Sequence, residues 1–292
     1  MTVLAELLEL LHLERIEVNL FRGQSQDLGW GRLYGGQVLG QALSAAAQTV
    51  EEGRCGHSMH GYFLRHGMAD TPVVYTVDPI RDGRSFSTRR VVAVQNGKAI
   101  FNLSASFQVE EAGLDHARAA PSGVTPPEEL MCQRDLARLV AHEIPPPLRE
   151  KVVGERPIEV RPVRPWNPLC PDERPPDSQV WFKSNGPLPD DPAVHRHLLA
   201  YASDSHFLTT ALFPHGVSWA TPGIQLASLD HAMWFHRPFR LDEWLLYDVH
   251  SPTACSAKGL VSGHLYTREG ALVATVVQEG LMRDWRGRAD TT

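Results

Sequence analysis

The sequence predicts an α+β fold built from two tandem copies of one unit, each a central helix wrapped by an antiparallel sheet. The main observation is a repeat: the segment 58–65 and the apolar strand after it return at 230–237, and Tyr75 recurs as Tyr247, 172 positions later. This spacing is too long for a solenoid repeat. A second observation is that glycine-containing hairpin turns separate the apolar runs after each predicted helix. We therefore expect two half-domains that pair as the subunits of a homodimer would.

The first copy begins with an amphipathic helix, because leucines recur at helical spacing among acidic residues near the amino terminus. A short strand at 19–24 and a glycine-rich turn follow. A helix is then expected over 36–49, with a face of small residues that can lie close against a sheet. Hairpin turns divide the remainder into strands at 57–65, 73–81, 85–95 and 99–109.

The second copy repeats this order. A strand is expected at 179–184, and a helix over 192–212 has a clear start, because Asp190 or Asp191 can cap it and Pro192 suits its first turn. Four further strands are expected near 224–237, 243–252, 256–267 and 271–283. A strand, a helix and four antiparallel strands that wrap it describe a hot-dog unit, and two such units give a double hot dog.

The segment between the copies has a different composition. Residues 110–177 hold 13 of the 22 prolines, which are disfavoured in helix interiors and central strands. A helical stretch at 130–140 and an extended stretch at 158–161 are expected on the surface of the paired sheets. The chain is thus predicted to divide into an N-terminal unit at 1–109, a linker at 110–177 and a C-terminal unit at 178–292 that carries the chemistry.

The composition is that of a globular protein with a large core. The 292 residues are 42% hydrophobic, and the formal net charge of −6 argues against a general nucleic-acid binder, which needs a basic surface. The four cysteines show no CxxC spacing, which favours a reducing compartment over a zinc ribbon or a disulfide framework. No membrane span, signal peptide or peroxisomal address is indicated. We expect a cytoplasmic protein.

Three familiar catalytic patterns fail when they are compared with their context. The segment 56–60 approaches the G-x-S-x-G nucleophile elbow, but its last residue is a histidine and no strand-turn-helix surrounds it. The glycines of 29–35 suggest a dinucleotide loop, yet no parallel βαβ unit follows. The 14 histidines include no H-E-x-x-H motif, so no metal site is predicted.

A group of polar residues confined to the second copy suggests where chemistry takes place. Asp204 lies at the edge of the apolar stripe of the predicted helix, where a carboxylate needs a partner unless it is an exposed flank or a local cap. Gln278 interrupts the apolar run of the last strand, at the position that Ala105 fills in the first copy. Ser228 can face the same layer, since the central helix lies across the sheet.

The chain resembles the acyl-CoA thioesterase II family. The resemblance runs over almost the full length and rests on uncommon strings at 21–24, 35–38, 81–86, 233–239 and 277–280. Members of this family are double hot-dog hydrolases of acyl-CoA thioesters, in which an Asp, a Thr or Ser, and a Gln hold the attacking water. The resemblance implies these roles for Asp204, Ser228 and Gln278, although similar bacterial members have Thr at the middle position.

The resemblance also implies an acyl-CoA substrate, no cofactor, no metal and a homo-oligomer, with a tetramer as one candidate. Asp204 would act as general base or water orienter, with Ser228 and Gln278 holding the water. The acyl chain is expected between helix and sheet, near Leu208 and the pair Trp234 and Phe235. A local basic patch for the phosphates of coenzyme A is expected among Arg65, Arg81, Arg84, Arg89, Arg90 and Lys98.

Three rival interpretations remain open at this point. A hot-dog hydratase or dehydratase binds the same class of substrate but pairs a catalytic histidine with an acid, and the sequence shows no such motif beside Asp204. A non-enzymatic acyl-CoA sensor usually carries a DNA-binding helix-turn-helix, which is not evident. A double hot dog that has lost its activity would bind acyl-CoA without turning it over.

Overall fold

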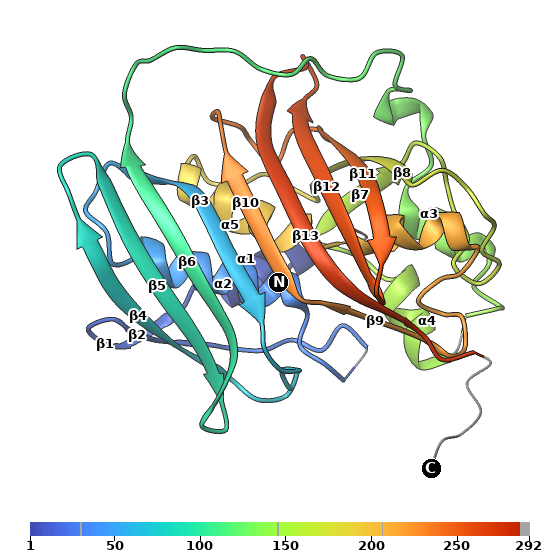
Figure 1. Cartoon of the computed structure of the whole chain (residues 1–292), viewed down its shortest axis with the longest axis horizontal. Helices are drawn as coiled ribbons and strands as arrows, with labels where there is room; N and C mark the ends of the chain where they lie inside the picture. Colours follow the sequence, from blue (N-terminus) through green and yellow to red (C-terminus); the bar gives the residue numbers. More distant parts are fainter. Residues whose placement is uncertain (30, 145, 206, 287–292) are drawn as a thin grey trace.

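The computed structural model of the chain describes residues 1–29, 31–144, 146–205 and 207–286. The strands of these residues form one 13-stranded sheet, and the long helices pack together against one of its faces (Figure 1). The strand order is β1-β2-β4-β5-β6-β3-β10-β13-β12-β11-β8-β7, with β9 paired to β13. This is the predicted α+β architecture, a continuous antiparallel sheet that curves around central helices.

The N-terminal half follows the predicted order closely. Its amphipathic helix is α1, which buries Leu4, Leu7 and Leu11. One short strand was not predicted, β1, which pairs with β2. The elements are α1 (Val3–Leu11), β1 (Glu14–Glu17), β2 (Leu20–Gly23), α2 (Gly35–Ala47), β3 (Arg54–Phe63), β4 (Val73–Asp82), β5 (Phe86–Gln95) and β6 (Lys98–Val109).

The C-terminal half contains two corrections to the predicted elements. The helix predicted over 192–212 is wrong in length, because α5 ends at Ser203 with Asp204 as its C-cap residue, and a separate 3-10 helix η2 follows. The strand predicted at 224–237 is two strands. The elements are β8 (Asp177–Ser184), α5 (Pro192–Ser203), η2 (Leu208–His215), β9 (Ile224–Ser228), β10 (Asp230–Phe235), β11 (Leu245–Cys255), β12 (Lys258–Thr267) and β13 (Leu272–Asp284).

The break between β9 and β10 has a local cause. The carboxylate Oδ1 of Asp230 accepts a hydrogen bond of 2.6 Å from the backbone N–H of Glu279 on β13. A side chain thereby takes the place of a backbone partner, so the register between the strands shifts at this point. The shift works as a β-bulge does, and it lets β9 and β10 pair with different stretches of β13.

The proline-rich segment crosses above the sheet in Figure 1 and then packs around the end of the C-terminal half. It contains η1 (Pro127–Glu129), α3 (Gln133–Leu139), α4 (Pro146–Val153) and β7 (Ile158–Pro162). β7 is an edge strand paired with β8, where proline is tolerated. Ala120, Val124 and Leu130 join Trp181 and Tyr266 in a small apolar cluster apart from the main core. None of the helices in the described residues has the length and hydropathy to cross a membrane.

The two halves are related by an approximate twofold axis. They join at β3 and β10, which pair antiparallel with His60 opposite Ala232. These two residues occupy equivalent positions of the repeat, 172 residues apart. On the other layer, α2 packs along α5, and Gly36 lets the helices approach closely, since a Cβ at this position would lie 2.2 Å from the backbone oxygen of Tyr201. The ends of the two helices therefore meet, the start of α2 beside the end of α5.

Candidate functional site

Asp204 lies where the end of α5 meets the start of α2. Its Oδ1 accepts a hydrogen bond of 2.9 Å from Nε2 of Gln278. Burial raises the pKa of this carboxyl group above its usual value, while the hydrogen bonds from Gln278 and from the backbone of Gly36 lower it. The balance is a raised pKa, so the carboxylate is a stronger base than an exposed aspartate.

Gln278 is the partner that the carboxylate requires. It lies on β13, is completely buried, and has Val261 opposite it on β12. Its Nε2 donates to Asp204, but its Oε1 has no hydrogen-bond partner among the described residues. A buried acceptor without a partner is destabilising by about 1–3 kcal/mol. Oε1 is therefore available to a donor such as water.

The start of α2 contributes backbone rather than side chains. The N-cap residue Tyr34 makes no side-chain cap, and the backbone of Gly36 donates to Asp204 instead, while the N–H of Gln37 bonds to the carbonyl of Tyr34. A Cβ on Gly35 would lie 2.7 Å from Oδ2 of Asp204, so only glycine permits this approach. A helix N-terminus favours negative charge. Backbone N–H groups near a helix start were expected to stabilise an oxyanion, but the sequence did not indicate which helix, although two adjacent glycines at the start of this one were a visible signal.

Ser228 lies beside this pair in the sheet but makes no hydrogen bond to it among the described residues. It is the last residue of β9 and lies opposite Gly280, two residues along β13 from Gln278. Since residues two apart on a strand share a face, Ser228 and Gln278 point to the same layer. Among the described residues, the Ser228 hydroxyl makes no hydrogen bond to Asp204 or Gln278. The structure thus joins Asp204 and Gln278 by a hydrogen bond, while Ser228 lies on the neighbouring strand, opposite Gly280.

These groups define what the site can do chemically. A carboxylate of raised pKa can accept a proton near neutral pH, and an amide oxygen beside it can hold the donor of that proton. Backbone N–H groups at the start of α2 can stabilise an oxyanion. In the part of the chain that the structure describes, no group of His, Cys, Asp and Glu side chains is arranged to hold a metal ion. The arrangement suits water activation.

One residue expected to line the acyl-chain space faces the opposite side of the sheet. Trp234 packs edge-on against the ring of His60, at 4.9 Å between ring centroids, on the face away from the helices. Phe235 and Leu208 are buried on the helix side. The expectation for Trp234 is wrong because adjacent residues of a strand point to opposite faces, so Trp234 and Phe235 cannot line one space.

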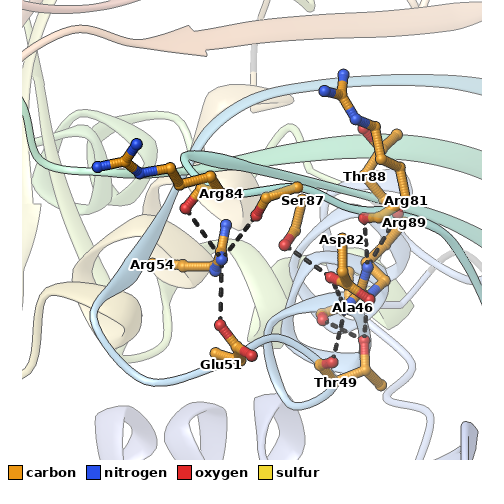
Figure 2. Close-up of polar contacts among 11 residues, drawn as sticks. Ala46, Thr49, Glu51, Arg54, Arg81, Asp82, Arg84, Ser87, Thr88 and Arg89 are labelled. Atoms are coloured by element: carbon orange, nitrogen blue, oxygen red, sulfur yellow. Dashed lines mark hydrogen bonds and ion pairs between the residues drawn. The ribbon is translucent and has the colours of Figure 1, made fainter.

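Arg89 is also not where the sequence analysis expected it. It is 2% exposed, so it cannot belong to a surface patch for phosphates. Figure 2 shows its guanidinium at the end of α2, where it donates to the carbonyl and hydroxyl oxygens of Thr49, both at 2.9 Å, and to Asp82 at 2.7 Å. Arg89 is paired with Ala105 in the first copy, as Val261 is paired with Gln278 in the second. In the first copy, therefore, Ala105 stands at the position of Gln278 and Arg89 stands at the position of Val261.

Comparison with known families covers both halves. The family model described as "Acyl-CoA thioesterase" matches residues 147–281. A second model, described as "Acyl-CoA thioesterase N-terminal domain", matches residues 25–108. The two matches follow the two copies of the repeat and include Asp204, Ser228 and Gln278.

Individual proteins give the same result. The chain is 43% identical to Acyl-CoA thioesterase 2 of Haemophilus influenzae over 281 residues, which cover 96% of this chain and 98% of that one. It is 42% identical to human Acyl-coenzyme A thioesterase 8, with 94% and 87% covered. The crystal structure of an acyl-CoA thioesterase II, TesB2, from Mycobacterium marinum superimposes with a TM-score of 0.79 at 42% identity, covering 97% and 100%.

The fold prediction is confirmed by a more distant structure as well. A protein with a hot-dog fold from Alicyclobacillus acidocaldarius matches with a TM-score of 0.76 at 17% identity and covers 95% of this chain and 98% of that one. At that identity the likeness concerns the fold alone. Together with the closer match, it identifies the two wrapped helices as a double hot dog.

Proposed function

This chain belongs to the acyl-CoA thioesterase family, and on that basis we propose that it hydrolyses acyl-CoA thioesters with a water molecule activated by Asp204, Ser228 and Gln278. The observation that carries this assignment is the hydrogen bond of 2.9 Å between Gln278 and Asp204. It joins a carboxylate at a helix end to the amide that only the second copy has. The products are a carboxylic acid and coenzyme A.

The proposed reaction begins with a water that donates one hydrogen bond to Gln278 Oε1 and a second to Asp204. As its oxygen attacks the thioester carbonyl carbon, Asp204 accepts the second proton. N–H groups at the start of α2 stabilise the oxyanion of the tetrahedral intermediate. The C–S bond then breaks, and the departing thiolate recovers the proton from Asp204. A thioester carbonyl is weakly stabilised by resonance, so an oriented water is a sufficient nucleophile.

Ser228 is proposed to hold the same water from a third direction. Its hydroxyl shares the face of Gln278, at the neighbouring strand pair, and is partly buried. A hydroxyl can both donate and accept, so it adapts to the water as the charge on Asp204 changes during the reaction.

A charge-removing variant tests the proposal directly. In Asp204→Asn, release of free thiol from acyl-CoA should fall by about 10²–10⁴-fold, the usual contribution of a general base, while acyl-CoA binding and the thermal melt stay close to wild type. The matched control is Asp191→Asn at the other end of α5, where the aspartate only caps the helix and asparagine caps equally well. Wild-type turnover in Asp204→Asn would disprove the assignment. Enoyl absorbance in the same samples tests the rival hydratase activity.

We further propose a homo-oligomer in the cytoplasm, in which the segment 178–292 supplies the catalytic side chains and the start of α2 supplies backbone N–H groups. The outer face of the sheet exposes large apolar side chains, among them Tyr62 at 58% and Phe86 at 38%, which a partner subunit would cover. Four free cysteines, three of them exposed, suit a reducing compartment. Light scattering on the purified chain tests the assembly, and a monomer at micromolar concentration would contradict it.

A further inference from the structure

His231 is a buried histidine that the proposed chemistry does not use. It lies on β10 with its side chain completely buried on the helix side of the sheet. Burial lowers its pKa to about 3, so the ring is neutral at any pH at which the protein would work. A neutral imidazole has one donor and one acceptor nitrogen, and its neighbours decide which is which.

One nitrogen of the His231 ring forms a hydrogen bond to the end of α5. His231 Nε2 lies 3.0 Å from the hydroxyl oxygen of Ser203, the residue before Asp204. That hydroxyl donates its proton to the carbonyl of Ala200, also at 3.0 Å, so it accepts from the histidine. Nε2 therefore carries the proton and Nδ1 is an acceptor. Tyr247 donates to the carbonyl of Ser203 at 3.2 Å, which fixes the same residue from β11.

The strand pairing places His231 beside the residue that carries the amide of the site. Ala232 of β10 is paired with Val277 of β13, so the next residues along, His231 and Gln278, are cross-strand neighbours. Both are completely buried on the same face. Side chains in such pairs start about 4.5–5.5 Å apart at Cβ. His231 Nδ1 and Gln278 Oε1 are both buried atoms without a hydrogen-bond partner among the described residues.

Two acceptors cannot bond to each other, but one molecule with two protons can satisfy both. Each acceptor left unpaired would be destabilising by about 1–3 kcal/mol, and a buried water with polar partners removes that penalty. Two adjacent unpaired acceptors on one buried face therefore point to a shared water. Such a water would use one of the two lone pairs of Gln278 Oε1 and leave the other for the attacking water, and it would fix the amide with its Nε2 toward Asp204.

We propose that His231 is a positioning residue of the thioesterase site, which orients Gln278 through a shared water and holds the end of α5 through Ser203. The proposal rests on the proposed function, because it assumes that the Asp204–Gln278 pair is the working pair. His231 touches neither substrate nor attacking water in this scheme. It acts by keeping the amide from rotating, since a rotated amide would turn its oxygen to the carboxylate.

This role has a consequence for the pH dependence of the reaction. The hydrogen bond from Gln278 is one of the contacts that lower the pKa of Asp204, so an unfixed amide would raise that pKa further. The titratable groups that face Asp204 in the described residues are the phenols of Tyr34 and Tyr247, and burial raises the pKa of both. They stay neutral, so a shift in the acid limb of kcat/KM reports on Asp204.

Two substitutions of His231 test the roles of its two ring nitrogens separately. In His231→Asn, the amide oxygen can take the place of Nδ1 and keep the shared water, while the contact to Ser203 is lost. In His231→Gln, the amide nitrogen can keep the contact to Ser203, while the acceptor at Nδ1 is lost. We expect His231→Gln to lower kcat about three- to tenfold, as for one hydrogen bond, and to move the acid limb of kcat/KM to higher pH. His231→Asn should leave that limb at its wild-type position.

A measurement on the unmodified protein covers the case in which these variants do not fold. Nitrogen-15 NMR of histidine-labelled wild-type protein, with the ring signals assigned to individual residues, should show a neutral His231 ring protonated at Nε2 that does not titrate down to pH 5; the buried His197, whose pKa is about 4, is distinguished by the assignment. The proposal would be overturned if the His231 ring were protonated at Nδ1. It would also be overturned if the folded variants His231→Gln and His231→Asn had the same kcat and the same acid limb of kcat/KM as each other. Asp204→Asn measured in parallel separates the two ideas: if it is inactive while His231→Gln is normal, only the role of His231 falls.

Discussion

At the residue scale, the buried carboxyl group of Asp204 weakens the fold when it is ionised. Burial is the largest influence on its carboxyl group, and it favours the neutral form against two hydrogen bonds that favour the charged one. The pKa in the folded chain is therefore above that in the unfolded chain. It follows that the ionised carboxylate weakens the fold, and that this effect grows as the pH rises through the folded pKa.

Asp204→Asn should accordingly be at least as stable as wild type at pH 7. As the pH falls toward 4, the carboxyl group of Asp204 in the wild-type protein becomes neutral, like the amide of the variant. The difference in stability between the variant and wild type should therefore shrink toward that pH. Chemical denaturation at pH 7 and pH 4 measures it. A variant clearly less stable than wild type at pH 7 would show that the hydrogen bonds outweigh burial.

Ser228 offers a second test at the same scale. If its hydroxyl holds the attacking water, Ser228→Ala should lose about one to two orders of magnitude in kcat, equivalent to ~1.4–2.7 kcal/mol. Ser228→Thr should remain active, because it keeps the hydroxyl. Steady-state kinetics and a thermal melt together give the answer. Unchanged turnover with a lower melting temperature in Ser228→Ala would assign the hydroxyl to the scaffold.

Residues of the site differ in how visible they are from the sequence. Asp204 and Gln278 could be found because each breaks an apolar pattern, and the structure joins them. His231 is not marked by its position in the sequence, because its partner Ser203 lies 28 positions away and meets it only through the fold. Arg89 was misplaced for a related reason: its partner Thr49 lies 40 positions away, and a lone arginine on a strand reads as solvent-exposed.

At the element scale, α2 is held by two buried glutamines that do structural work. Gln41 is 0% exposed, and its Nε2 donates to the carbonyls of Leu10 and Gln24 at 2.7 and 2.9 Å. Its Oε1 accepts from the phenol of Tyr75 at 2.7 Å. One side chain thus ties α2 to the end of α1, to the loop after β2 and to β4. Gln37 adds a bond of 2.8 Å to the same carbonyl of Gln24.

Gln41→Ala should therefore destabilise the fold more than it slows the chemistry. It leaves buried polar groups of Leu10, Gln24 and Tyr75 short of partners, each worth about 1–3 kcal/mol. We expect a clearly lower melting temperature with kcat per folded molecule near wild type. Gln48→Ala is the matched control, since Gln48 is an exposed residue at the end of the same helix. Loss of turnover without loss of stability or binding would place α2 glutamines in the chemistry.

Elements were predicted well where a local signal ends them. The turn between β5 and β6 has Asn96 and Gly97 at positive φ, the pattern that marks a two-residue hairpin. The end of α5 had no such signal. Residues 204–207 contain neither glycine nor proline, and apolar residues continue at helical spacing to Leu212, so one long helix was the natural prediction. There the C-cap residue Asp204 contacts the start of α2, a segment distant in the sequence, so no local pattern marks this helix end.

At the scale of the whole molecule, the equivalent ends of α5 and α2 contact different groups. The end of α5 presents Asp204 to Gln278 and to the glycines of α2. The end of α2 faces Ala105 and Arg89 instead, and α5 starts with Pro192, which has no N–H to offer an oxyanion. The duplication thus keeps the helix packing twice, and only one end brings together the groups to which we assign the chemistry.

Arg89→Met tests this division of roles. The substitution keeps most of the buried volume but removes the donors to Thr49 and Asp82, so the end of α2 loses its fastening. We expect the free energy of unfolding to fall by about 1–3 kcal/mol, the effect of leaving buried acceptors unpaired, and thioester hydrolysis per folded molecule to stay within about twofold of wild type. Arg90→Met is the matched control, because Arg90 is the next residue of β5 and its ion pair with Asp78 is exposed, where such pairs contribute little. If Arg89→Met abolished turnover at an unchanged melting temperature, the first copy would hold a working site, and the assignment of the chemistry to the Asp204 end alone would be wrong.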